Sequence, residues 1–428
     1  MSTQATVTNK IDFRKINKHE PRWLYNIRKN SWNSFLEMGL PERVVHLWKY
    51  TDPENFLIEN LPEAMNILPL SDDRSESQSI NSEYSGYGYN RPDNMTITSL
   101  DEKSVESGVI FKDLHSATVE NENLVANHLG HLVNENTGKF EALNTALWAT
   151  GLFLYIPDNT IVEKPIRLQR HPSGTATFLR LLVIVGKNSE VTFIDDYSGE
   201  CRQSDAVNNS IAEIYVGESS NVRYANIQRF GDNCRSYITQ RARLAAKARI
   251  HAVYGGLGGS ISKVNAGTIL AGQGADSKMS GVVFSSGNQH FDYHTLHHHE
   301  ASESFSNIDF KVVLKDKAVS SYTGLIRINE DTKNCEAYQL NRNLLLNRGT
   351  KAESIPELEI LCDQVRCSHG STTGPIDPEM LFYLKSRGFG NDEAIKTLIT
   401  GFVEPTLSQM PADLAEVLMD LMLRKLEG

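Results

Sequence analysis

The chain has 428 residues, of which 22 % are charged and 40 % hydrophobic, a balance typical of a globular protein with two or three domains. Its formal net charge of −10 argues against a nucleic-acid binder or a protein of anionic membrane surfaces, because both need a basic surface. No run of about 18 apolar residues is present to cross a bilayer, and residues 1–10 lack the hydrophobic segment of a secretory leader.

Residues 1–149 are predicted to form a mostly helical domain. Hydrophobic residues recur at helical spacing in residues 20–56 and again in residues 113–147, and Gly39 ends the first helix. Residues 71–94 are rich in Ser, Asn, Asp and Gly and have no periodicity. This composition predicts a flexible linker within the domain.

Residues 150–375 consist of short β-rich runs separated by tight polar turns. Two turns, which begin at Gly186 and Gly217, are 31 residues apart, and each follows an apolar run. Weaker turns follow at residues 245–248, 272–275, 315–317 and 347–349. A repeat near 30 residues built from strands and turns predicts a parallel β-helix or another β-solenoid. The unequal spacing of the turns leaves a β-sandwich as the alternative.

Residues 376–428 are predicted to form a C-terminal helical domain. Asp377 can cap the first helix with Pro378 at its first position, and Gly388 ends it. Two further helices begin near residues 391 and 412, and each has an apolar stripe. Such a stripe packs on a core or docks a partner protein.

Cys367 and His369 are the candidate site residues. In a strand they alternate with Arg366 and Ser368, so the thiol and the imidazole point the same way, roughly 6.6 Å apart along the strand. Such a pair suits zinc, iron or part of an iron–sulfur cluster. The alternative is that Cys367 is a small core residue and His369 is simply hydrogen-bonded. The five cysteines are irregularly spaced, which predicts reduced thiols in a cytoplasmic protein. They are Cys201, Cys234, Cys335, Cys362 and Cys367.

Other motifs point to no complete site. The glycine-rich residues 255–259 and 272–279 lack the spacing of nucleotide-binding loops, so we interpret both as turns and expect no ATP hydrolysis. Cys362 and Cys367 would lie on opposite faces of a single strand, which disfavours a self-contained zinc site. Asp195 and Asp196 would likewise point in opposite directions, against a shared catalytic role.

A group of histidines is the densest cluster of this residue type in the chain. A metal site is one interpretation of it, and packing on a surface or between strands is the other. The group comprises His290, His294, His297, His298 and His299.

Several short stretches carry a recognisable pattern. Towards the C-terminus they are residues 339–346, 356–360, 365–370 and 382–388, and towards the N-terminus they are residues 21–23, 48–51, 140–148 and 151–157. Together they extend over most of the chain and resemble the SufB/SufD family of iron–sulfur cluster assembly proteins. The run Cys367-Ser-His369-Gly370 is most like the SufD branch of the family.

The resemblance implies a right-handed parallel β-helix between N-terminal and C-terminal helical domains. It implies a non-catalytic scaffold that pairs with SufB through the β-helix and binds the SufC ATPase through helices in residues 377–428. His369, with Cys367 beside it, would then lie at a shared site for a transient iron–sulfur cluster, and this chain itself would bind no nucleotide. Two alternatives stay open: a SufB-like homodimer and a carbohydrate-active β-helix enzyme.

Overall fold

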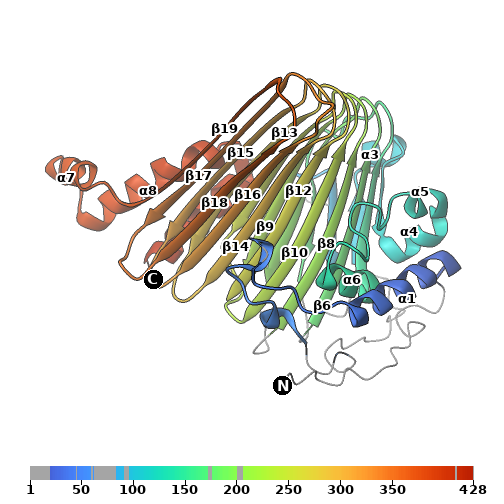
Figure 1. The fold of residues 1–428 in the computed structure, drawn as a ribbon, viewed down its shortest axis with the longest axis horizontal. Helices are drawn as coiled ribbons and strands as arrows, with labels where there is room; N and C mark the ends of the chain where they lie inside the picture. The colour runs from blue at the N-terminus through green and yellow to red at the C-terminus, as the bar shows by residue number, and fades with distance from the viewer. Residues whose placement is uncertain are drawn as a thin grey trace.

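The computed structural model describes residues 20–44, 46–58, 61, 83–90, 96–171, 176–199, 206–409 and 412–427. Two long sheets face each other across a narrow interior, and the chain alternates between them (Figure 1). About 46 % of the residues lie in strands, and the alternation makes a β-solenoid of about seven turns. The prediction of a solenoid with helices at both ends is therefore confirmed.

The strands of each sheet are given in their spatial order. Sheet A contains β19 (Val365–Pro375), β17 (Cys335–Leu345), β15 (Phe305–Leu314), β13 (Asp276–Ser285), β11 (Arg249–Gly256), β9 (Asn221–Phe230), β7 (Glu190–Gly199), β5 (Ile166–Arg170), β1 (Gly86–Asn90) and β2 (Thr96–Leu100). Sheet B contains β18 (Lys351–Ile360), β16 (Val319–Ile328), β14 (His290–His299), β12 (Ile261–Leu270), β10 (Cys234–Leu244), β8 (Ala206–Val216), β6 (Ala176–Val185), β4 (Thr150–Ile156) and β3 (Ile110–Asp113).

The coils stack in parallel register, with paired residues 26 to 32 positions apart in sequence. The turns from sheet B to sheet A repeat one conformation, in which one residue per coil has a positive φ of 51–72° and its amide donates to a carbonyl of the next coil. These residues are Asn159, Asn188, Ser219, Lys247, Gly274, Glu303 and Asn334.

Glycine is required where neighbouring turns approach closely. A Cβ at Gly217 would lie 2.5 Å from the carbonyl oxygen of Gly186 in the preceding coil. Residues 315–317 and 347–349 belong to the other corner, which leads from sheet A to sheet B. The unequal turn spacing in the sequence therefore reflects two corners, and a β-sandwich is not needed to explain it.

Helices cover the outer faces of both sheets. The helical elements are α1 (Arg22–Glu37), η2 (His46–Trp48), η3 (Pro53–Phe56), α3 (Glu102–Glu106), α4 (Leu114–Glu120), α5 (Glu122–Ala126), α6 (Lys139–Leu147), α7 (Pro378–Ser386), α8 (Asn391–Leu407) and α9 (Ala412–Glu427). The apolar stripes of α8 and α9 pack on the outer face of sheet A, whereas α1 and α6 pack on the first strands of sheet B. Within the described residues, no helix has the length and apolar character needed to cross a bilayer.

The predicted caps of α7 are present: the Asp377 side chain accepts from the amide of Glu379, Pro378 is at the first position, and Gly388 has a φ of +100°. The linker prediction is wrong for Gly86–Asn90, which forms β1, because this strand pairs with β5 on one side and β2 on the other. Residues 71–82 and 91–94 of that segment lie outside the described residues. The domain boundaries after residues 149 and 375 stay predictions.

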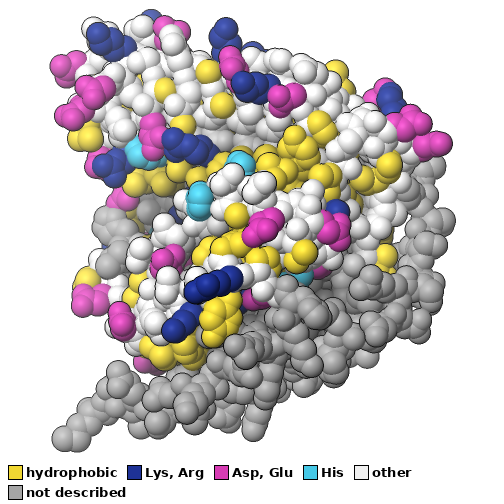
Figure 2. All heavy atoms as spheres, turned by 90° about the vertical axis from the view of Figure 1, so that its right-hand side faces the viewer, with side chains coloured by type: hydrophobic (Ala, Val, Ile, Leu, Met, Phe, Trp, Pro, Cys, Tyr) yellow, Lys and Arg dark blue, Asp and Glu magenta, His cyan; other side chains and the backbone are white. Residues whose placement is uncertain are grey.

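The two ends of the solenoid differ. At the end that we call capped, β1, β2 and β3 turn the outermost pairings antiparallel and close both sheets. Figure 2 views the molecule from the side of α3, α4 and α5 and shows charges of both signs among hydrophobic side chains. At the end that we call open, β19 and β18 are the terminal strands of sheets A and B.

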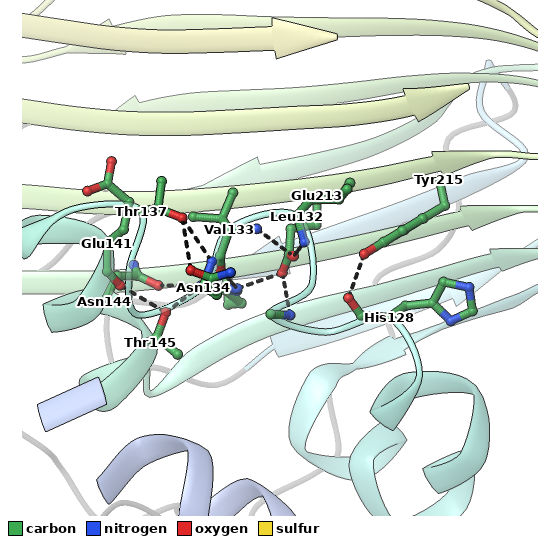
Figure 3. Close-up of polar contacts among 12 residues, drawn as sticks. His128, Leu132, Val133, Asn134, Thr137, Glu141, Asn144, Thr145, Glu213 and Tyr215 are labelled. Atoms are coloured by element: carbon green, nitrogen blue, oxygen red, sulfur yellow. Dashed lines mark hydrogen bonds and ion pairs between the residues drawn. The ribbon is translucent and has the colours of Figure 1, made fainter. Parts of the chain in front are cut away.

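Glu213 ties the N-terminal loop to sheet B in the capped half (Figure 3). Its buried carboxylate accepts from the backbone amides of Gly130, Leu132 and Val133 at 2.9–3.1 Å. Arg180, also buried, forms an ion pair with it at 2.6 Å. The carboxylate thus holds residues 130–133 against the sheet.

Candidate functional site

Cys367 and His369 lie on the inner face of β19. Ala337 pairs with Cys367 and Gln339 with His369 in the parallel ladder between β17 and β19. Cys367 packs against an apolar cluster inside the last coils, so its side chain points inward, and His369, two residues later, shares that face. Because β19 is the terminal strand of its sheet, the inner face opens to the surface there: Cys367 is half-buried and His369 is exposed.

The thiol of Cys367 is held in its protonated form. Burial raises its pKa to about 11, with a further contribution from the nearby thiols of Cys335 and Cys362 and opposition from the backbone amide of Ala337. A soft metal ion bound here must displace the proton, since the thiolate is the ligand. The residue is therefore inert as a free thiol near neutral pH and becomes a ligand when a metal competes for it.

Two further cysteines lie in or against the apolar cluster that Cys367 contacts. Cys335 is buried beneath it and contacts the hydroxyl of Ser304 at 3.3 Å, while Cys362 packs against the same cluster. The argument that Cys362 and Cys367 lie on opposite faces is wrong, because a corner between β18 and β19 interrupts the strand. Cys335 was missed as a neighbour, although its distance of 32 residues from Cys367 is about one coil.

These residues do not form a closed metal site. Among the described residues, no group of three or more His, Cys, Asp or Glu side chains is arranged to hold a metal ion. The four cysteines within that part of the chain, Cys234, Cys335, Cys362 and Cys367, are free thiols. A metal held by Cys367 and His369 would need further ligands from another molecule.

The histidine group is divided between the two faces of β14. His297 and His299 point into the interior, where His297 bonds to Ser277 at 3.0 Å and His299 to Ser304 and Ser306 at 2.7 and 2.8 Å. Burial lowers the pKa of His297 to about 3 and of His299 to about 4. The other three histidines alternate onto the outer face, which separates the group.

The remaining motifs have structural roles. Asp195 points inward to Arg170, while Asp196 points outward to Arg167 and Arg229, so the two acids do point in opposite directions and each is ion-paired. Residues 255–259 end β11 and lead into a corner, and residues 272–275 form a corner between β12 and β13.

A second surface of interest is α7, which extends beyond the sheets on the side of the open end (Figure 1). None of its residues is buried. Met380, Phe382 and Tyr383 are 58 %, 73 % and 56 % exposed. Residues 376–428 thus differ internally: α8 and α9 use their apolar stripes on sheet A, whereas α7 leaves apolar side chains in contact with solvent. Exposed aromatic and Met side chains on one short helix are typical of a protein-interaction surface.

Comparison with known proteins gives a consistent result along the chain. A family model described as SUF system FeS cluster assembly, SufBD core domain, matches residues 167–402, and one described as SufBD protein N-terminal region matches residues 10–168. Similar proteins occur in Staphylococcus saprophyticus, Staphylococcus aureus and Staphylococcus epidermidis, each named an iron–sulfur cluster assembly SufBD family protein. Each is 25 % identical over 422 residues, which is 96 % of this chain and 91 % of the relative.

Proposed function

This chain belongs to the SufBD family of iron–sulfur cluster assembly proteins, and we propose that it is a scaffold subunit of the SufD type. In this proposal it pairs with SufB at the open end, binds the SufC ATPase, and presents His369 and Cys367 to a transient iron–sulfur cluster. The cluster is cargo under assembly and leaves the complex. The subunit acts in the cytoplasm, where thiols stay reduced.

The observation that carries the proposal is an incomplete set of metal ligands on the terminal strand of a sheet. Cys367 and His369 share one face of the terminal strand of sheet A, and that face opens outward. A terminal strand offers unpaired backbone groups to a strand from another chain. A second subunit that adds to this edge brings its own ligands opposite the thiol and the imidazole. A site split in this way suits a cluster that must later be released.

The ATPase partner is assigned to α7. Its exposed Met380, Phe382 and Tyr383 offer apolar side chains on the side of the open end, and the stripes of α8 and α9 are already used on sheet A. The chain has no nucleotide-binding loop of its own at residues 255–259 or 272–279. We infer that nucleotide hydrolysis is supplied by SufC and that this chain is not itself an enzyme.

Two alternatives make different predictions. A SufB-like subunit would form a stable homodimer, so the mass of the purified chain with and without SufB separates it from a SufD-like subunit. A carbohydrate-active enzyme would need acidic residues free in a groove. Asp195 and Asp196 are instead ion-paired to arginines, which disfavours that class.

The test is anaerobic cluster reconstitution of the complex with SufB and SufC. We expect His369→Ala to reduce cluster formation to near background and Cys367→Ser to reduce it less, while both variants still co-purify with the partners. Ser368→Ala is the matched control, because Ser368 lies between the two ligands but points to the opposite face. Wild-type cluster yield with His369→Ala contradicts the role of this residue.

A further inference from the structure

Among the described residues, two side chains on the inner face of the open end have buried polar atoms without a hydrogen-bond partner. Gln339, in β17, is 3 % exposed, and within the described residues neither its amide oxygen nor its amide nitrogen has a partner. The hydroxyl of Ser354, in β18, is unpaired there as well. Buried polar atoms of folded proteins are nearly always hydrogen-bonded. A buried amide whose oxygen and nitrogen both lack a partner therefore indicates that this position has a role other than packing.

The strand register places this amide beneath the candidate ligand. Gln339 pairs with His369 on one side and with Ile308 on the other, and all three alternate onto the inner face. Ile308 offers no polar group. Paired residues of neighbouring strands are about 4.8 Å apart, so the register brings the imidazole of His369 within reach of the Gln339 amide.

The facing strand makes room for the amide. Gly324 lies opposite in β16, where a Cβ would collide with the amide nitrogen of Gln339 and lie 2.6 Å from the hydroxyl oxygen of Tyr322. That hydroxyl is bonded to Thr295 at 2.9 Å. The space above Gly324 therefore admits the Gln339 side chain, and the tyrosine beside it is already paired to a residue deeper in the interior.

We propose that Gln339 is a positioning residue for His369. Its amide holds one ring nitrogen of the imidazole through one water shared with Ser354, and leaves the other nitrogen free to face the cluster. A histidine that binds a metal depends on such a partner to fix its tautomer and ring orientation. An amide can serve either tautomer without adding charge. This inference rests on the proposed function of His369.

The first measurement needs no cluster. In the full-length chain labelled with ¹⁵N-histidine, the His369 signals are identified by their loss in His369→Ala. We expect the wild-type ring to show a single dominant tautomer at mildly alkaline pH. Gln339→Met, which keeps the chain length but not the amide, should give a mixture of tautomers, and Gln339→Glu should restore one. Gln240→Met is the matched control, because Gln240 is also a buried interior glutamine but lies several coils away.

The second measurement is cluster reconstitution with SufB and SufC. Gln339→Met should lower the yield about tenfold, with Gln339→Glu recovering most of it and Gln240→Met unchanged. If Gln339→Met does not fold, Gln339→Asn gives the same test, because it withdraws the amide by one methylene. Unchanged His369 ring shifts in a folded Gln339 variant overturn the inference, whatever His369→Ala does. If His369→Ala assembles clusters normally, the proposed function fails instead, and the role of Gln339 in assembly falls with it.

Discussion

The two ends of the solenoid face the same physical problem and solve it differently. A coil buries its inner face only against a neighbour, so the first and last coils need a cover. At the capped end, β1, β2 and β3 supply it, and β4 and β5 are almost wholly buried on their inner faces. At the open end, β18 and β19 are half-exposed along their length. The cap lets the chain fold as a unit, and the open end is suited to a cover from another chain.

The capped half contains the buried charges whose loss should matter most for stability. Glu213→Leu leaves Arg180 buried without its partner and removes the acceptor of three backbone amides. Breaking such a pair costs about 3–5 kcal/mol of unfolding free energy. Chemical denaturation of the variant measures this loss. The proposed binding of SufB at the open end should survive at denaturant concentrations below the variant's unfolding midpoint.

Two controls qualify that prediction. The double variant Arg180→Leu/Glu213→Leu should be less destabilised than Glu213→Leu, because it leaves no unpaired charge. Glu190→Leu, at an exposed position of β7, should change the free energy by less than about 0.5 kcal/mol. A single Glu213→Leu variant within about 1 kcal/mol of wild type would show that this ion pair does not fasten the N-terminal loop.

Acid should act on the half nearer the open end through His297 and His299. Their pKa values are lowered to about 3 and 4, so the folded chain excludes protons that the unfolded chain binds below about pH 6.5. The stability they contribute is present above that pH and is lost as pH falls toward 4. Between pH 6.5 and 5, the unfolding free energy of the protein should fall by about 2 kcal/mol for each of the two histidines.

The measurement is the unfolding free energy at several pH values. The His297→Leu variant has no titrating group at this position. Between pH 6.5 and 5, its unfolding free energy should therefore fall by about 2 kcal/mol less than that of the wild type. His131→Leu, at an exposed position, is the control and should follow the wild type. Equal slopes in His297→Leu and wild type would mean that the interior admits protonated His297.

The sequence predicted the solenoid because the repeat and the turn chemistry are local. The turns at Gly186 and Gly217 lie where the pattern predicts them. The later predicted turns are unequally spaced because some belong to the corner from sheet B to sheet A and others to the corner from sheet A to sheet B. The linker was misread because β1 has little apolar periodicity and gains its stability from pairing with β2 and β5. Such pairing is long-range, and composition does not encode it.

The site was predictable only in part, for the same reason. Alternation along one strand is local, so the shared face of Cys367 and His369 could be predicted. The proximity of Cys335 and Gln339 depends on the register of the next coil, and the error over Cys362 depends on where a corner interrupts the strand. That β19 is a terminal strand, and that its inner face opens outward, follows from the whole topology.

Substitutions at the open end should have the smallest effect on folding. They also test most directly whether the open end differs from the capped end in binding a partner. Leu361, which directly follows β18, and Ser371, on β19, are both exposed at the open end. Leu361→Lys/Ser371→Lys adds two charges where a partner strand would pair, and charged side chains on an edge strand oppose such pairing. We expect affinity for SufB to fall at least tenfold, about 1.4 kcal/mol, with stability within about 0.5 kcal/mol of wild type.

The matched control places the charge at the other end. Val105, in α3, is 58 % exposed beside the cap, and Val105→Lys should leave both stability and affinity for SufB unchanged. Titration of the labelled chain with SufB measures all three proteins side by side. An equal loss of affinity in the two variants would point to long-range charge repulsion, and no loss in either would place the SufB interface away from the open end. A loss confined to Leu361→Lys/Ser371→Lys is expected if SufB supplies the cover that the last coil lacks.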